Sequence, residues 1–356
     1  MKKILFLGDA NSIHVKKWVD YFVACGYITH LATFSANNIT SAQQVHFLSQ
    51  QEVNVGGNNY KYLLSVPRLA ALIAKIKPDH INAHYSYSMG LVALLALKSK
   101  RLHVPTSVVC HGSDVLLPPI PYLSNLINYY VLSNVDIVFS VSSQITTTLL
   151  SMGIKGEKIH NGMYGVERNN IRSISGALWS IKEIDIISYR SYVSNSRIAE
   201  MLQALNRSEF YDKNIVFILP NADSKQLDEL REAHPFIIFY GGIPHEELIE
   251  LVVKSKIYIS ATKSDGTSLS LLEAMDNGAY PVVSDIPSNR VWVKERENGR
   301  LFSTFDQFTA IILETLRETK EFYCRNMEYN FKLIDEKALY DNRIREIEQV
   351  IINYKS

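Results

Sequence analysis

The sequence predicts an α/β protein made of two doubly wound domains, each with a parallel sheet covered by helices. Short apolar runs alternate with segments of helical spacing along the whole chain, which is the pattern of βαβ units. The alternation weakens at residues 161–173, which are rich in Gly and Asn, and then resumes. The 356 residues are enough for two domains of ~150 residues each.

Composition excludes several classes of protein. Hydrophobic residues make up 47% and charged residues 21% of the chain, as in ordinary globular proteins. The net charge of +1 gives no general reason to expect nucleic-acid binding. No apolar run approaches the ~20 residues of a membrane span, and residues 4–7 are too short a run for a signal peptide. The three cysteines are widely spaced, which favours a reducing cytoplasm over a disulfide or metal pattern.

The first domain is expected at residues 1–164. Its strands are predicted at 3–8, 28–34, 79–84, 106–110 and 136–141, with helical segments at 14–25, 67–76, 87–100 and 122–134. The strands are short and apolar, as in sheets buried on both faces. The C-terminal segment 338–356 is amphipathic, with Ile344, Ile347 and Ile351 on one side, and we expect it to cross back to this domain.

The second domain is expected at residues 165–337, with strands at 183–189, 214–220, 236–242, 256–261 and 280–285. Ligands of doubly wound sheets bind beyond the carboxyl ends of the strands. With two such domains, the cleft between them is the expected site. The residues that directly follow each strand are therefore the candidate functional residues.

The stretch SDGTSLSLLEAMDNG, residues 264–278, joins a strand to a helix. Gly266 permits a tight turn, and Thr267 and Ser268 are good helix N-cap residues. The N–H groups at a helix start form an anion site suited to phosphate, while the carboxylates of Asp265 and Glu273 accept hydrogen bonds from sugar hydroxyls. An acid at the helix dipole and a solvated Glu explain the same pattern, so the stretch alone leaves both interpretations open.

Residues 256–302 resemble the donor-binding signature of GT-B glycosyltransferases of family four, in its polysaccharide and lipopolysaccharide branch. The resemblance implies that Asp265 contacts the transferred sugar and that Glu273 holds the nucleotide ribose. It also implies that Thr267, Ser268 and Leu269, beside Gly266, present N–H groups to the diphosphate. The segment VPTSVVCHGSDVLLP resembles a strand end of the family's N-domain, which places His111 near the reacting carbon of the donor sugar. Asp114 is expected to orient that loop.

Other strand ends extend the resemblance. Gly8 begins the loop that the family places over the donor phosphates and the acceptor. Ser12 and His14 are candidate acceptor contacts, although Ser12 is equally well explained as a helix cap. Arg190 matches the family's diphosphate arginine, but Asn195 stands where the family has a lysine. One expected positive charge is therefore missing from the donor site.

The resemblance implies a retaining, metal-independent transfer of a hexosyl or N-acetylhexosaminyl group, with His111, Asp265 and Arg190 as catalytic residues. The donor is a UDP- or GDP-linked sugar, bound with Asn195 nearby, and the acceptor is a glycan or lipid-linked glycan. No cofactor and no nucleic acid is expected. The N-terminal domain is assigned to the acceptor and the C-terminal domain to the nucleotide sugar.

Two alternative functions and the location remain open. The missing charge at Asn195 makes a catalytically weak or inactive binding subunit of a glycosylation complex the main alternative. Another GT-B chemistry, such as that of a sugar phosphorylase or nucleotide-sugar epimerase, is the second. His80 and His84 fall in a strand, where their spacing is too wide for a shared metal. The protein is expected in the cytoplasm, with possible contact at the inner face of the plasma membrane. Helix 14–25 mixes Lys16 and Lys17 with aromatic residues, but Trp18 and Phe22 favour a core helix.

Overall fold

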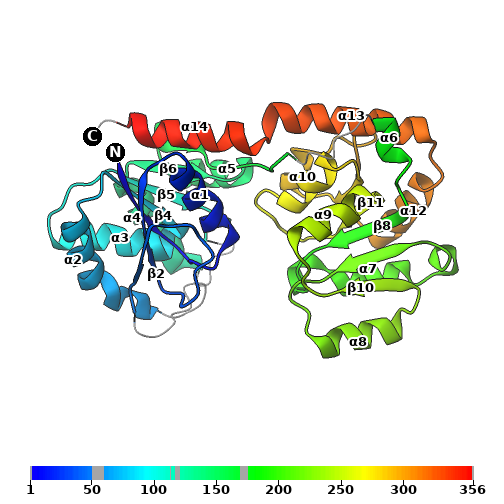
Figure 1. The fold of residues 1–356 in the computed structure, drawn as a ribbon, viewed down its shortest axis with the longest axis horizontal. Helices are drawn as coiled ribbons and strands as arrows, with labels where there is room; N and C mark the ends of the chain where they lie inside the picture. The colour runs from blue at the N-terminus through cyan, green and yellow to red at the C-terminus, as the bar shows by residue number, and fades with distance from the viewer. Residues whose placement is uncertain (1, 50–59, 113, 117–120, 169–174, 355–356) are drawn as a thin grey trace. The chain divides into compact units, whose positions relative to one another are not determined.

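The computed structural model describes residues 2–49, 60–112, 114–116, 121–168 and 175–354. The chain divides into an N-terminal unit, Met1–Tyr164 with Asp341–Ser356, and a C-terminal unit, Gly165–Tyr340. Each unit contains one parallel sheet with helices on its faces (Figure 1). The predicted α/β fold of two doubly wound domains is confirmed.

The sheet of the N-terminal unit has seven parallel strands in the order β3-β2-β1-β4-β5-β6-β7. The five predicted strands are its central ones: β1 (Lys3–Leu7), β2 (Ile28–Thr33), β4 (His80–His84), β5 (Thr106–Cys110) and β6 (Ile137–Ser140). The two edge strands, β3 (Gln44–Phe47) and β7 (Ile159–Asn161), were not predicted. They are short and half-exposed, so they lack the apolar run that marks a strand buried on both faces.

Helices cover this sheet on both faces: α1 (Ile13–Ala24), α2 (Val66–Ile76), α3 (Leu91–Ser99), α4 (Pro121–Asn134) and α5 (Ser143–Ser151). Shorter turns are η1 (Tyr60–Ser65), the π-helix η2 (Tyr85–Gly90) and η3 (Gly156–Lys158). Trp18 and Phe22 of α1 are fully buried. The face of α1 that carries Trp18 and Phe22 therefore belongs to the core and not to a membrane contact.

The C-terminal helix α14 (Tyr340–Asn353) packs on the N-terminal unit (Figure 1). The hydroxyls of Tyr21 and Tyr27 both donate to the Glu348 carboxylate, at 2.7 Å. Lys2 Nζ donates to the Ile352 carbonyl at 2.7 Å. These bonds hold the end of the chain against the domain in which it begins.

The sheet of the C-terminal unit has six parallel strands in the order β10-β9-β8-β11-β12-β13. They are β8 (Ile184–Tyr189), β9 (Ile215–Ile218), β10 (Ile237–Tyr240), β11 (Ser255–Ser260), β12 (Tyr280–Ser284) and β13 (Arg300–Phe302). Only the three-residue edge strand β13 was not predicted. The helices are α6 (Ser175–Trp179), α7 (Ile198–Leu205), α8 (Ser224–Ala233), α9 (His245–Val253), α10 (Leu269–Asp276), α11 (Pro287–Arg290), α12 (Phe305–Thr315) and α13 (Lys320–Lys337), with short turns η4 (Ser194–Ser196) and η5 (Ser208–Phe210).

Residues 338–340 lie with the C-terminal unit, so the chain returns to the N-terminal unit at Asp341 and not at the expected residue 338. Val166 N donates to the Ala338 carbonyl at 2.8 Å, and Tyr340 N donates back to Val166 at 2.9 Å. Gly165 has a φ of 78°, and a Cβ there would lie 2.1 Å from the Ala338 oxygen. Only glycine fits this close approach, so residues 165–166 and 338–340 lie against each other within the C-terminal unit.

No helix in the described part of the chain is long and apolar enough to cross a membrane. The same residues contain no group of three or more His, Cys, Asp or Glu that could hold a metal ion.

Candidate functional site

The start of helix α10 forms the centre of the predicted donor site. Ser268 occupies the N-cap with extended backbone, and its hydroxyl accepts from Leu271 N at 3.3 Å. The apolar residues Leu271, Leu272 and Met275 are buried on the sheet side. The first N–H groups of a helix have no acceptor within it and lie at the positive end of its dipole. The loop Asp265–Ser268 therefore leads into an anion-attracting helix start at the carboxyl end of β11.

Arg190 lies at this helix start. It follows β8, and one guanidinium nitrogen donates to the hydroxyls of Ser270 and Ser268, at 2.7 and 3.1 Å. The other terminal nitrogen pairs with Asp265 at 2.9 Å. A cation beside a helix N-terminus is electrostatically unfavourable unless an anion compensates both. Asp265 supplies one negative charge, and a phosphate would be a further favourable partner.

Asn195 bonds to the loop that carries Asp265. Its side-chain amide donates to the Ser264 carbonyl at 2.9 Å, and its amide oxygen accepts from Ser264 N at 3.2 Å. Lys263 N also donates to the Asn195 carbonyl, at 2.9 Å. Asn195 thus holds the loop that precedes Asp265. We call these bonds the Asn195 clasp.

Glu273 contacts a residue that the sequence did not single out. Its carboxylate lies 3.0 Å from His245 Nε2. His245 begins α9, directly after the segment Gly241–Pro244 at the end of β10. The sequence could have identified His245 as a candidate, because it comes soon after a predicted strand. The pair places an imidazole beside the carboxylate that the resemblance assigns to the ribose.

His111, in the N-terminal unit, belongs to a histidine pair. It follows β5, and its Nε2 lies 2.9 Å from Nδ1 of His84, the last residue of β4. Burial, followed by the neighbouring charge of His14, lowers the pKa of His84 to about 3. Burial also lowers the pKa of His111 well below its usual range, with His84 and His14 adding to the effect. Both rings are therefore neutral at neutral pH. The hydrogen bond to His84 engages Nε2 of His111, so Nδ1 is the other polar atom of the His111 ring.

Asp114 organises the loop around His111. It is fully buried, and its carboxylate accepts from the backbone N–H groups of His111, Gly112 and Ser86, each at 3.0 Å. Burial raises its pKa despite these bonds. The geometry is that of an orienting residue, since these bonds fix the backbone that carries His111.

The predicted acceptor residues lie near this pair. His14 Nδ1 is 3.0 Å from the Tyr164 hydroxyl, and the ring centroids of His14 and His111 are 5.2 Å apart. Ser12 takes the N-cap position of α1, but its side chain makes no capping bond. A Cβ on Gly8 would lie 2.7 Å from a methyl group of Val15. Gly8 thus lets α1 pack closely on the end of β1, and Tyr164 is a polar neighbour that the sequence did not reveal.

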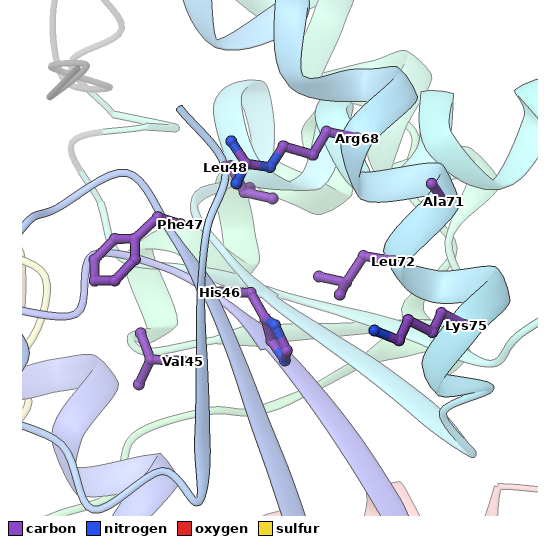
Figure 2. Close-up of a pocket in the computed structure, with 8 residues that line it drawn as sticks. All are labelled: Val45, His46, Phe47, Leu48, Arg68, Ala71, Leu72 and Lys75. Atoms are coloured by element: carbon purple, nitrogen blue, oxygen red, sulfur yellow. The ribbon is translucent and has the colours of Figure 1, made fainter. Parts of the chain in front are cut away.

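A hollow of about 440 Å³ lies elsewhere in the N-terminal unit, between β3 and α2 (Figure 2). The side chains of His46, Leu72 and Lys75 point toward one another across it, while Phe47 points away. Burial, followed by the charge of Lys75, lowers the pKa of His46. None of the predicted site residues lines this hollow.

Comparison with known families covers both units. Residues 3–142 match the family model "Glycosyl transferase 4-like", and residues 175–332 match "Glycosyl transferases group 1". A segment of 95 residues is 27% identical to glycosyltransferase 1 domain-containing protein 1 of Xenopus tropicalis. That match spans 27% of this chain and 28% of the relative's length.

Solved structures share the fold over nearly the whole chain. Anabaena HepE, solved with UDP and glucose, is 12% identical, covers 99% of this chain and 100% of its own, and has a TM-score of 0.77. Sucrose-phosphate synthase of Thermosynechococcus elongatus is 14% identical, with 98% of each chain covered and a TM-score of 0.80. WaaG, a glycosyltransferase involved in lipopolysaccharide biosynthesis, is 11% identical over 98% of this chain and 99% of its own, with a TM-score of 0.74.

Proposed function

Because one glycosyltransferase family model matches residues 3–142 and another matches residues 175–332, we propose that this protein transfers a sugar from a nucleotide-sugar donor to a glycan or lipid-linked glycan. In this proposal the C-terminal unit binds the donor and the N-terminal unit binds the acceptor. The transfer retains the configuration of the sugar and needs no metal ion. The protein works in the cytoplasm, at the inner face of the plasma membrane.

One observation carries the proposal for the donor: Arg190 and the start of α10 converge on the same point. Both favour negative charge there. When the bond from the sugar to the diphosphate breaks, negative charge grows on the leaving phosphate. Fixed positive potential stabilises that charge without reorganising in the transition state.

The family resemblance supports the roles of the other residues. Asp265, paired with Arg190, and Gly266 face the transferred sugar. Glu273 accepts hydrogen bonds from the ribose hydroxyls, and the neutral ring of His111 binds the donor sugar through its second nitrogen.

The acceptor is held by Ser12 and His14, and its hydroxyl attacks from the face that the diphosphate leaves. UDP is the first donor nucleotide to test, since the structurally similar HepE was solved with UDP and with UDP-glucose. A GDP-linked donor is the other candidate. The donor sugar is a hexose or an N-acetylhexosamine.

A catalytically weak or inactive binding subunit is the second candidate. The Asn195 clasp favours it, because Asn195 brings no charge to the phosphates and its amide is already engaged with Ser264. Such a protein would bind nucleotide without turning it over.

The deciding experiment measures nucleoside diphosphate release from a panel of UDP- and GDP-sugars, with and without glycan acceptors, in buffer containing EDTA. We expect acceptor-stimulated release, and the anomeric configuration of the product is then read by NMR. Arg190→Ala should lower turnover ~100-fold or more, as losing a transition-state charge stabiliser does. Arg317→Ala, an exposed arginine on the same unit, is the matched control.

The outcomes separate the candidates. Nucleotide binding by calorimetry without turnover on any donor supports the binding subunit. Normal turnover in Arg190→Ala overturns the phosphate assignment. Activity that disappears in EDTA and returns with Mn²⁺ or Mg²⁺ overturns the metal-independent mechanism.

A further inference from the structure

Helix α4 of the N-terminal unit buries polar side chains in its first half and apolar ones, Val131 and Leu132, near its end. Its buried face includes the polar residues Ser124 and Asn128, which are 2% and 0% exposed. Asn128 Nδ2 donates to the Asp114 carbonyl at 2.7 Å, and the Ser86 hydroxyl donates to the Asn128 side-chain oxygen. An ordinary surface helix turns its apolar side to the core. Here bonds to the loop around His111 hold a polar side inward.

Five apolar or aromatic side chains of α4 face outward. Tyr122 is 80% exposed, and the other four are between 40% and 52% exposed: Leu123, Leu126, Tyr129 and Tyr130. Leu150 of α5 is 50% exposed. Helix α4 approaches the end of α5 here, since a Cβ on Gly153, two residues after α5, would lie 3.8 Å from the Tyr129 ring. We call these six side chains the α4 patch.

The charges around the α4 patch have one dominant sign. Asp136 is the only charged residue between Asp114 and Lys155 in the sequence, and it accepts bonds from Tyr354 and Thr106. Lys98, Lys100 and Arg101 are exposed at the end of α3, which packs beside α4. Lys98 Nζ donates to the Tyr130 hydroxyl at 2.9 Å. Among the residues that the structure describes, no ion pair involves these three cations. The exposed acid Glu157 is 3.8 Å from Lys155.

We propose that the α4 patch docks on the surface of a lipid bilayer that contains anionic lipids. Leucine side chains enter the acyl region, and tyrosines suit the boundary between apolar chains and headgroups. The three cations beside the patch attract anionic headgroups.

A second copy of this chain fits the patch less well. A two-fold interface would bring the same surface, with its cations, against itself. The patch offers no unpaired acid of its own to meet them. A bilayer satisfies both the apolar side chains and the neighbouring charges, and the inference does not depend on which sugar is transferred.

The experiment is flotation of the full-length protein with vesicles of phosphatidylcholine, alone or with phosphatidylglycerol. We expect binding to the anionic vesicles that weakens with added salt. The triple variant Leu123→Ser, Leu126→Ser, Tyr129→Ser should lower partitioning by about tenfold or more. Lys100→Gln and Arg101→Gln should each lower binding to anionic vesicles roughly fivefold, with little effect on neutral ones.

The matched control replaces three apolar side chains of the C-terminal unit that are 46–54% exposed: Tyr211→Ser, Ile238→Ser and Val291→Ser. It should float as the wild type does. Melting temperature and UDP affinity are measured for each variant. If the triple variant fails to fold, the single variant Tyr122→Ser, at the most exposed position of the patch, replaces it. The proposal is overturned if the wild type does not float, or if the folded patch variants float equally well. It is also overturned if light scattering shows a dimer that the patch variants convert to monomer.

Discussion

Replacing Asn195 by lysine would restore the charge that the family resemblance leads one to expect, yet the structure predicts a loss of stability. The side chain of Asn195 makes two hydrogen bonds with the backbone of Ser264. A lysine can make neither in the same geometry. At ~1 kcal/mol net for each bond, the substitution costs about 2 kcal/mol at most, because the site is half-buried and water can replace part of the loss.

For a domain of this size, such a loss lowers the melting temperature by roughly 4–8 °C. Scanning calorimetry of the whole chain measures it, and titration with UDP measures whether the donor loop has shifted. We expect Asn195→Lys to melt earlier and to bind UDP no more tightly than the wild type. Val193→Lys is the matched control, since it adds the same charge two residues away on a side chain that is 47% exposed. An Asn195→Lys protein that melts like the wild type and binds UDP more tightly would refute the clasp and restore position 195 to the phosphates.

Three further predictions follow from the same contacts. Glu273→Gln should weaken UDP binding about tenfold, since a hydrogen bond to a charged group is worth ~1.5 kcal/mol or more; an unchanged calorimetric affinity would contradict the ribose assignment. His111→Ala should lower turnover ~100-fold while UDP affinity stays constant, and normal turnover would leave His111 a structural residue. Stability should also fall as the pH drops below 6.5. Burial, with a smaller contribution from Lys2, lowers the pKa of His80 to about 3, and the pKa of His84 is likewise about 3. The unfolded chain therefore takes up protons first, at ~1.4 kcal/mol per pH unit for each histidine. Urea unfolding at pH 7.5 and 5.5 tests this, with a smaller pH effect expected in His80→Gln.

The sequence predicted the fold because its signal is local. A strand buried on both faces is a short apolar run, and ten of the strands were predicted in this way. The edge strands β3, β7 and β13 were not, since strands of three or four residues carry no such run: β3 and β7 are half-exposed, and β13 begins with Arg300. The sequence also located the helix start at Ser268 and the positions of His111 and Arg190 after strands, because these depend only on where neighbouring elements end.

The tertiary structure alone decided what each of these side chains contacts. Arg190 and Asp265 are 75 residues apart in the sequence, and Asn195 and Ser264 are 69 apart. The lengths of the apolar runs predicted a chain without a membrane span, but only packing shows that α1 buries Trp18 and Phe22 while α4 exposes its three tyrosines. Such pairings depend on the order of strands in the sheet and on the direction in which each side chain leaves its element. Both are set by the packing of the whole domain, so no local pattern of residues can determine them.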